Sequence, residues 1–366
     1  MERAQCFVPG RIELLGKHVD YLGGRSLTCA TPWGLELEAT RVPGAPGVAG
    51  NDDVYTRAVL RRLSRDIGSL HTGVELRVRS DLPPAAGLSS SSAWVLGVLW
   101  ALAWANDLPE RSNWRAAGLQ EPLAFAAYAA AIEVGYAWGP FAGDAGVGTR
   151  GGAQDHLAIV GARAGCVQQF AYLPAQLEAR TAWPAHWRLL VLHSGVVAEK
   201  SGAAQEAFNR VAAAGHARGA ARQEQFRCEC DELVPAALAA IGSADAAALG
   251  AAARESQNAA ESVLGNQIEE TVALVRLAEK SGAFAASAFG AGFGGAVWAA
   301  APADNASAVL ERWRSAYAAQ FPGRAAAVWT GLMSPSAGMR DSRGIPRPQK
   351  PSTDRISSPE SSGITL

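Results

Sequence analysis

Four side chains that can bind or polarise a ligand lie close together near the N-terminus. Arg11, Lys17, His18 and Asp20 fall within the segment PGRIELLGKHVDYLGG at residues 9–24. Its glycines permit tight turns and close approach of the backbone to a ligand. The segment is not a P-loop, because its spacing has one residue too many and His18 stands where a P-loop has a hydroxyl for Mg²⁺. Taken alone, His18 fits a structural histidine, but its neighbour Asp20 favours a role in binding a polar ligand.

A serine-rich segment, LPPAAGLSSSSAW at residues 82–94, leads into an apolar run that predicts a buried helix. Glycine and serine at a helix N-terminus offer free backbone N–H groups and the positive end of the helix dipole, which favour a phosphate. The hydroxyls can add donors and one Mg²⁺ ligand. A serine N-cap on an ordinary core helix explains the segment equally well. The candidate nucleotide-binding residues are Gly87, Leu88, Ser89, Ser90, Ser91 and Ser92.

A third glycine-rich segment, SAFGAGFGGAVW at residues 287–298, lies between two apolar runs that predict strands. Small residues at such a turn allow a ligand to approach the backbone closely. Gly292 and Gly294 are candidates for contact with a nucleotide. The alternative is a glycine-rich hairpin turn without a ligand.

The elements that must position these segments follow from the hydrophobic pattern. Strands are predicted at 26–42, 73–79 and 187–193, with two more within 156–172 and two within 283–301. Helices are predicted at 54–68, 91–105, 121–133 and 304–319, with a broken helical region at 201–279. A glycine-rich loop is expected at 139–152. Strands and helices in this order indicate an α+β fold.

The composition excludes several classes of protein. A net charge of −1 gives no field that would recruit nucleic acid or an anionic membrane. Five scattered cysteines argue against a disulfide framework, and no zinc-ligand spacing occurs. There is no apolar signal segment at the N-terminus, and the longest apolar run, 93–105, is too short to cross a bilayer. We expect a cytoplasmic protein; its oligomeric state leaves no trace in the sequence.

The chain length allows two packed domains. We expect an N-terminal domain at 1–190, with the first two glycine-rich segments, and a C-terminal domain at 191–337, with the third. Residues 338–366 are rich in Ser, Pro and Arg, with almost nothing to bury, which predicts a disordered tail.

Together, in order and spacing, the three segments resemble the signatures of the GHMP kinase superfamily, named for galactokinase, homoserine, mevalonate and phosphomevalonate kinases. The first segment is similar to the galactokinase signature, in which Pro-Gly-Arg is followed by Gly-Glu-His-Thr-Asp-Tyr and Gly-Gly. The resemblance spans about residues 7–335. It implies a ribosomal-protein-S5-like N-terminal domain and a ferredoxin-like C-terminal domain, with the active site in the cleft between them. It also implies transfer of a phosphoryl group from ATP, with Mg²⁺, to the C1 hydroxyl of a sugar.

The resemblance implies roles for individual residues. Arg11 matches the arginine beside the transferred phosphoryl group, and Asp155 matches the aspartate that faces the reacting hydroxyl. Ser91 and Glu133 match the Mg²⁺ ligands. The remaining matches lie on the sugar side, at His18, Asp20 and Gly152. Without the resemblance, a turn or N-cap aspartate is the favoured interpretation of Asp155, since it follows two glycines.

Departures from the family pattern lie mainly on the sugar side. Lys17 stands where the family has a sugar-contacting glutamate, Phe208 where it has a tyrosine, and Glu13 where it has an asparagine. If Lys17 faces the sugar, a uronic acid such as galacturonate becomes a candidate substrate beside galactose and other neutral sugars. Alternatively, Lys17 pairs with Glu13 or points to solvent. A different class of function, a non-catalytic sugar and ATP sensor, also stays open.

Overall fold

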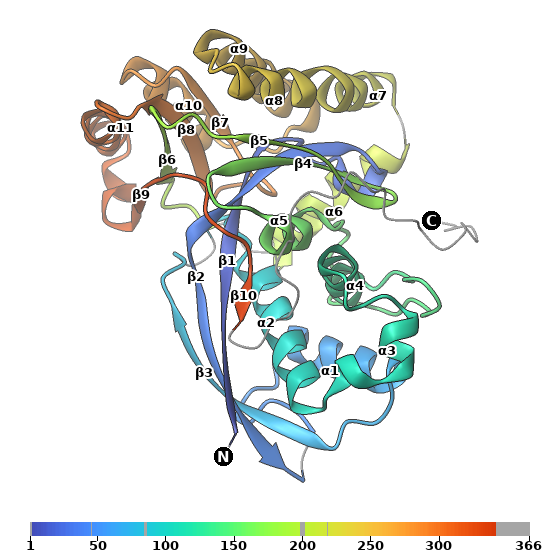
Figure 1. The fold of residues 1–366 in the computed structure, drawn as a ribbon. Coiled ribbons are helices and arrows are strands. Elements are labelled where there is room, and N and C mark those ends of the chain that lie inside the picture. Colours follow the sequence, from blue (N-terminus) through green and yellow to red (C-terminus); the bar gives the residue numbers. More distant parts are fainter. Residues whose placement is uncertain (1, 45, 84–85, 198–201, 218, 342–366) are drawn as a thin grey trace.

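Two antiparallel sheets, each with helices packed against it, build the fold (Figure 1). The computed structural model describes residues 2–44, 46–83, 86–197, 202–217 and 219–341. The first sheet has the strand order β10-β1-β2-β4-β5, with β3 also paired to β2, and the second has the order β7-β8-β6-β9. The expected mixture of helices and sheets is confirmed.

Two long strands form the centre of the first sheet. β1 (Arg3–Leu15) pairs antiparallel with β2 (Arg25–Pro43), and β2 also pairs with β3 (Thr72–Ser80) and β4 (Cys166–Tyr172). The register of β1 shifts at Pro9/Arg11 and at Glu13/Leu15, but it is continuous from Arg11 to Glu13. Because alternate residues of a strand share a face, Arg11 and Glu13 lie on the same side of the sheet.

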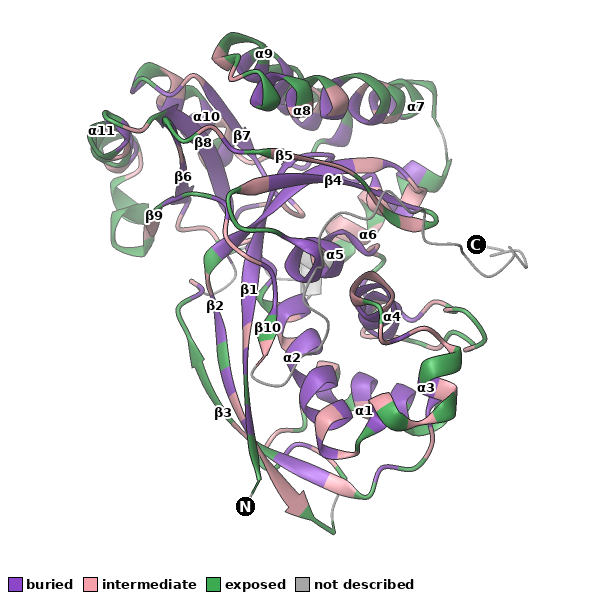
Figure 2. Cartoon of the chain, in the orientation of Figure 1, coloured by how far each residue is buried: buried purple, intermediate pink, exposed green. Residues whose placement is uncertain are grey.

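Helices cover one face of the first sheet, as Figure 1 shows. They are α1 (Val54–Asp66), α2 (Ser90–Ala105), α3 (Ser112–Ala116), α4 (Pro122–Val134) and α5 (Gln154–Gly161). α2 contacts both β1 and β2, and most of its residues are buried (Figure 2). The prediction of a buried helix after the serine run is therefore confirmed.

The second sheet contains β6 (Trp187–His193), β7 (Ala285–Ala288), β8 (Ala296–Pro302) and β9 (Thr330–Met333). Helices α10 (Glu269–Lys280) and α11 (Ala306–Gln320) pack against it. The described chain between β6 and β7 contains the further helices α6 (Gly202–Ala217), α7 (Ala220–Arg227), α8 (Val234–Gly242) and α9 (Ala246–Ala259). The predicted domain boundary at 190/191 lies within β6, and the limits of the two domains stay a prediction.

Several parts of the sequence prediction differ from the structure. Residues 3–15 form β1, although no strand was predicted there. Residues 154–161 form α5, where a strand was expected from about 156, because a short apolar run fits a buried helix as well as a strand. β5 (Ala175–Ala182), an edge strand with alternating exposure, was also missed.

The first residues of the predicted tail belong to the fold. β10 (Arg340–Asp341) pairs with Cys6 and Phe7 of β1, and Trp100 Nε1 donates to Asp341 Oδ2 at 2.8 Å. The backbone N–H of Met339 donates to Ile159 O at 2.9 Å. Composition did not reveal this segment, because backbone pairing to a sheet edge needs few apolar side chains. The rest of the predicted tail, residues 342–366, lies outside the described residues.

Other expectations concern what the chain lacks. All five cysteines are free. Among the described residues, no group of three or more His, Cys, Asp or Glu side chains could hold a metal ion. In the same part of the chain, no helix has both the length and the apolar character that a membrane span requires.

Candidate active site

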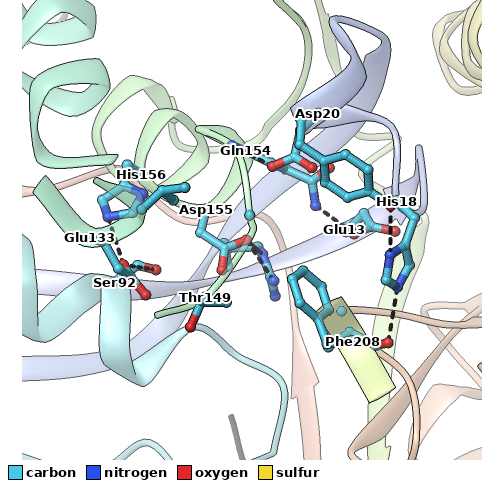
Figure 3. A pocket seen from close by; sticks show the side chains of 17 residues that line it. Glu13, His18, Asp20, Ser92, Glu133, Thr149, Gln154, Asp155, His156 and Phe208 are labelled. Carbon is cyan, nitrogen blue, oxygen red and sulfur yellow. Dashed lines mark hydrogen bonds and ion pairs between the residues drawn. The ribbon is translucent and has the colours of Figure 1, made fainter. Parts of the chain in front are cut away.

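A cavity lies where the turn after β1, the N-terminus of α5 and the third glycine-rich segment meet (Figure 3). Its lining comes from β1, α2, α4, the loop after α4, α5, α6 and the third segment. The predicted site residues in the lining are Arg11, His18, Asp20, Ser92, Glu133, Gly152, Asp155 and Phe208. Candidate residues that are far apart in the sequence thus lie together in one cavity.

Arg11 and Asp155 form an ion pair in this cavity. Nε of Arg11 donates to Asp155 Oδ1 at 2.8 Å, and Nη2 lies 2.7 Å from the same oxygen. The Arg11 side chain is 4% exposed and the Asp155 side chain 16%. Arg11 reaches Asp155 from the face of β1, and Asp155 lies in the first turn of α5. A guanidinium thus lies beside a partly accessible carboxylate.

Glu133 lies beside the serine run, at one end of the cavity. Ser92 Oγ donates to Glu133 Oε2 at 3.0 Å, and Ser91 Oγ donates to Oε1 at 3.4 Å. His156 Nε2 lies 3.0 Å from Oε2, without hydrogen-bond alignment. Glu133 is the penultimate residue of α4, and α4 packs against α2, so the two helices bring these oxygens together. Sequence reasoning missed the proximity of His156 to this carboxylate.

The serine-rich segment approaches Arg11 through its backbone. The N–H of Arg11 donates to Leu88 O at 3.2 Å, and Nη1 donates to Gly87 O at 2.5 Å. Ser89 has a φ of 64°, a left-handed conformation, directly before the first turn of α2. Ser89 Oγ is buried and has no hydrogen-bond partner among the described residues. The helix start therefore lies next to Arg11, with an unsatisfied hydroxyl.

The third glycine-rich segment reaches the cavity at Gly290 and Ala291. The predicted residues Gly292 and Gly294 do not line it. Both have positive φ, 82° and 134°. At Gly292 a Cβ atom would lie 2.2 Å from Asn266 O, so glycine is required there by the close backbone approach. Their role in nucleotide binding stays a prediction.

The other end of the cavity contains His18, Asp20 and Phe208. His18 Nε2 lies 3.0 Å from Ala291 O and Nδ1 lies 3.1 Å from Tyr21 Oη, so Nε2 carries the proton and Nδ1 accepts. Burial lowers the pKa of His18 to about 4, so the ring is neutral at neutral pH. The Phe208 ring lies 5.1 Å from the His18 ring, centre to centre.

Asp20 and Gly152 are in direct contact. Asp20 Oδ2 accepts from the backbone N–H of Gln154 at 3.3 Å, at the start of α5. A Cβ atom on Gly152 would lie 2.5 Å from the same oxygen. The glycine therefore lets the Asp20 carboxylate approach the N-terminus of α5. This contact joins the first segment to the helix that carries Asp155.

Glu13 and Gln154 also line the cavity, and neither was predicted as a site residue. Gln154 Nε2 donates to Glu13 Oε2. Burial raises the pKa of Glu13 to about 7, against the opposing effect of Lys17 and Arg11. The spacing of two from Arg11 would have pointed to Glu13, if residues 3–15 had been recognised as a strand.

Lys17 is the predicted sugar-side residue that the structure does not bring to the cavity. Its side chain is 1% exposed, and Nζ donates to Ser256 Oγ at 2.9 Å and to Ser287 Oγ at 2.8 Å. Burial lowers its pKa, opposed by the charges of Glu229 and Glu13. Lys17 therefore neither contacts the cavity nor points to solvent.

Comparisons with known proteins agree with this geometry. The GHMP kinases N-terminal domain matches residues 54–135, the GHMP kinases C-terminal domain matches residues 237–319, and the galactokinase galactose-binding signature matches residues 2–40. The structure is similar to that of Lactococcus lactis galactokinase complexed with galactose, with a TM-score of 0.75, 18% identity, and 93% and 95% of the two chains covered. It is also similar to L. major mevalonate kinase in complex with R-mevalonate, with a TM-score of 0.64, 17% identity, and 91% and 96% covered.

Two curated relatives are galactokinases. The protein from Exiguobacterium sibiricum is 31% identical over 118 residues, which are 25% of this chain and 30% of the relative. The protein from Actinobacillus pleuropneumoniae is 25% identical over 124 residues, 28% and 32% of the two lengths. The matched segments thus span about a third of the relatives' length. The fold and the paired domain matches define a GHMP kinase. Within this superfamily, the galactokinase galactose-binding signature covers β1, the turn after it and most of β2.

Proposed function

We propose that the protein transfers the terminal phosphoryl group of ATP to a hydroxyl of a monosaccharide, with galactose and its C1 hydroxyl as the favoured substrate. The observation that carries the proposal is the Arg11–Asp155 pair, which lies between the Ser92–Glu133 end and the His18–Asp20 end of one cavity. The galactokinase signature on residues 2–40 supports galactose.

Phosphoryl transfer depends on positioning and on stabilisation of charge. Arg11 would stabilise negative charge on the group in transfer, because its guanidinium is always charged and lies in a buried site. Asp155 would accept the proton of the sugar hydroxyl or hold that hydroxyl in line. A carboxylate beside a guanidinium is a weak base, so orientation of the nucleophile is its larger contribution.

The Ser91, Ser92 and Glu133 side chains suit a hard cation. A carboxylate and two hydroxyl oxygens converge there, and Mg²⁺ prefers a carboxylate, water and phosphate oxygens. Ser91 and Glu133 would hold the ion, which when bound would neutralise charge on the phosphates. The helix start at Ser89–Ser92 would bind the triphosphate, and the buried Ser89 Oγ would gain a partner.

Galactose is favoured over a uronic acid. The uronate alternative depended on Lys17 facing the sugar, and Lys17 instead bonds to Ser256 and Ser287. The sugar end of the cavity contains the carboxyl groups of Glu13 and Asp20. These would repel a substrate carboxylate, whereas sugar hydroxyls can donate to them.

A sugar panel with an ADP readout tests the proposal. Galactose, galacturonate, arabinose and fucose are supplied with ATP and Mg²⁺. We expect ADP to form with galactose, and galacturonate to be inert. ADP formation with galacturonate alone would overturn the substrate assignment. Binding of ATP and galactose without any ADP would instead support the sensor alternative.

A further inference from the structure

Two buried acceptor atoms in the cavity have no hydrogen-bond donor within the described part of the chain. They are Oε1 of Glu13 and Oε1 of Gln154. Both residues line the cavity, and they are only 2% and 5% exposed. A buried acceptor without a donor is costly, so two such atoms on residues that line one cavity indicate that a ligand supplies the donors.

A hydrogen bond fixes the orientation of this pair. Gln154 Nε2 donates to Oε2 of Glu13. An ionised carboxylate can only accept, so the Gln154 amide turns its nitrogen toward Glu13 and its carbonyl oxygen away. The remaining oxygens of the two side chains are therefore the acceptors that are left without a donor.

The pair lies on the side of the cavity opposite the candidate phosphate site. Gln154 directly precedes Asp155, and Glu13 shares a face of β1 with Arg11. Figure 3 shows Glu13 and Gln154 near Asp20 and His18, with Ser92 and Glu133 beyond Asp155. A substrate whose reacting hydroxyl lies at Asp155 would thus place another part of its ring at Glu13.

We propose that Glu13 and Gln154 form an acceptor subsite for sugar hydroxyls other than the one phosphorylated. The subsite rests on the proposed function. It assigns discrimination among sugars to Glu13 and Gln154 rather than to Lys17. A hydroxyl supplies the missing donors without adding charge, whereas a carboxylate at this point would face two acceptors and no donor.

Calorimetric titration of galactose and its monodeoxy forms tests the subsite without requiring turnover. The titrations are run above the pKa of Glu13, on the wild type, Glu13→Gln and Gln154→Met. For the wild type, removal of the contacted hydroxyl should weaken binding by about tenfold or more. In each variant, galactose itself should bind about tenfold more weakly, and removal of the same hydroxyl should then cost less than about threefold.

Gln168→Met is the matched control. Gln168 is a buried glutamine of β4 that also has an unpartnered Oε1, but it does not line the cavity. Its variant should bind galactose as the wild type does. Thermal melting shows whether each variant is folded, and Glu13→Asn serves if Glu13→Gln is not.

The outcomes separate the subsite from the proposed kinase activity. If removal of each hydroxyl weakens sugar binding by the same factor in the wild type and in both variants, the proposed subsite is wrong, even if ADP forms. If the costs change as expected but no sugar yields ADP, the subsite stands and the kinase proposal fails. If the wild type binds no galactose, both are overturned.

Discussion

At the residue scale, the Arg11–Asp155 pair carries the candidate chemistry, so its removal should abolish activity without unfolding the protein. We expect Asp155→Asn to lower kcat by about 10²–10⁴-fold, because the nucleophile loses its orienting carboxylate. Arg11→Ala should lower kcat by at least about 10²-fold, because charge on the transferred group is no longer stabilised. Steady-state kinetics with galactose and ATP measure both.

The control for this prediction is another arginine–carboxylate pair. Arg25 Nε donates to Glu178 Oε2 at 2.8 Å, and neither residue lines the cavity. Glu178→Gln should retain nearly normal kcat. Near-normal turnover in both Arg11→Ala and Asp155→Asn would show that the reaction takes place elsewhere.

Glu13 should give the protein a measurable pH-dependent stability. Its pKa is about 7 in the folded protein, against a value of 4.5 for an unperturbed glutamate. Between these values the folded protein keeps a proton that the unfolded chain releases. The free energy of unfolding therefore falls as pH rises through this window, by up to about 3 kcal/mol.

Glu13→Gln has no carboxyl group to titrate at this position. The free energy of unfolding of the variant, minus that of the wild type, should therefore increase as pH rises from 4.5 to 7. Urea unfolding across this range measures the margin. Glu36→Gln, an exposed change on β2, controls for the loss of one carboxylate. A margin that does not change with pH would mean that Glu13 is ionised as readily in the fold as in the unfolded chain.

At the element scale, the start of α5 depends on the glycine before it. Gly152→Ala would place Cβ 2.5 Å from Asp20 Oδ2, so the carboxylate must move away from α5. We expect a loss of about 1–3 kcal/mol of stability and a higher KM for the sugar. Gly151→Ala is the matched control, because its Cβ would meet only Val134 Cγ2 at 3.8 Å. Its stability should stay within about 0.5 kcal/mol of the wild type. Equal effects of the two changes would contradict this account.

The elements also show why some of the site was predictable. Arg11, Asp155, Ser91 and Glu133 lie in short glycine- or serine-rich motifs or at a helix end, where the local sequence suggests a ligand. Glu13 and Gln154 lie in β1 and α5. β1 was missed because Pro9 and Gly10 interrupt its strand pattern. α5 was misassigned because a short buried run has no distinctive period. Their role depends on partners that are distant in the sequence. Glu13 and Gln154 themselves are 141 positions apart. The prediction that Lys17 faces the sugar was wrong for the same reason, because the partners of Lys17 lie on α9 and β7.

At the scale of the whole molecule, Lys17 is part of a buried polar network. This network joins the turn after β1, in the first sheet, to α9 and to β7 of the second sheet. Ser256 lies on α9 and Ser287 on β7, whereas Lys17 follows β1. Glu229, 1% exposed, accepts from the Gly16 backbone N–H at 2.7 Å and from Ser256 Oγ at 2.8 Å. Lys17 and Glu229 thus share Ser256, and the network holds the sugar-signature turn against the second half of the chain.

Lys17→Met should therefore destabilise the protein more than it alters sugar recognition. It removes a buried cation near Glu229, and loss of one partner from a buried charged group costs about 3–5 kcal/mol. The KM for galactose should change by less than about threefold in the protein that remains folded. Urea unfolding and sugar kinetics on the same preparation separate the two effects. Arg314→Ala, in an exposed pair with Glu311, should leave the stability of the protein nearly unchanged. A Lys17→Met protein of normal stability whose sugar preference had shifted would instead place Lys17 at the substrate.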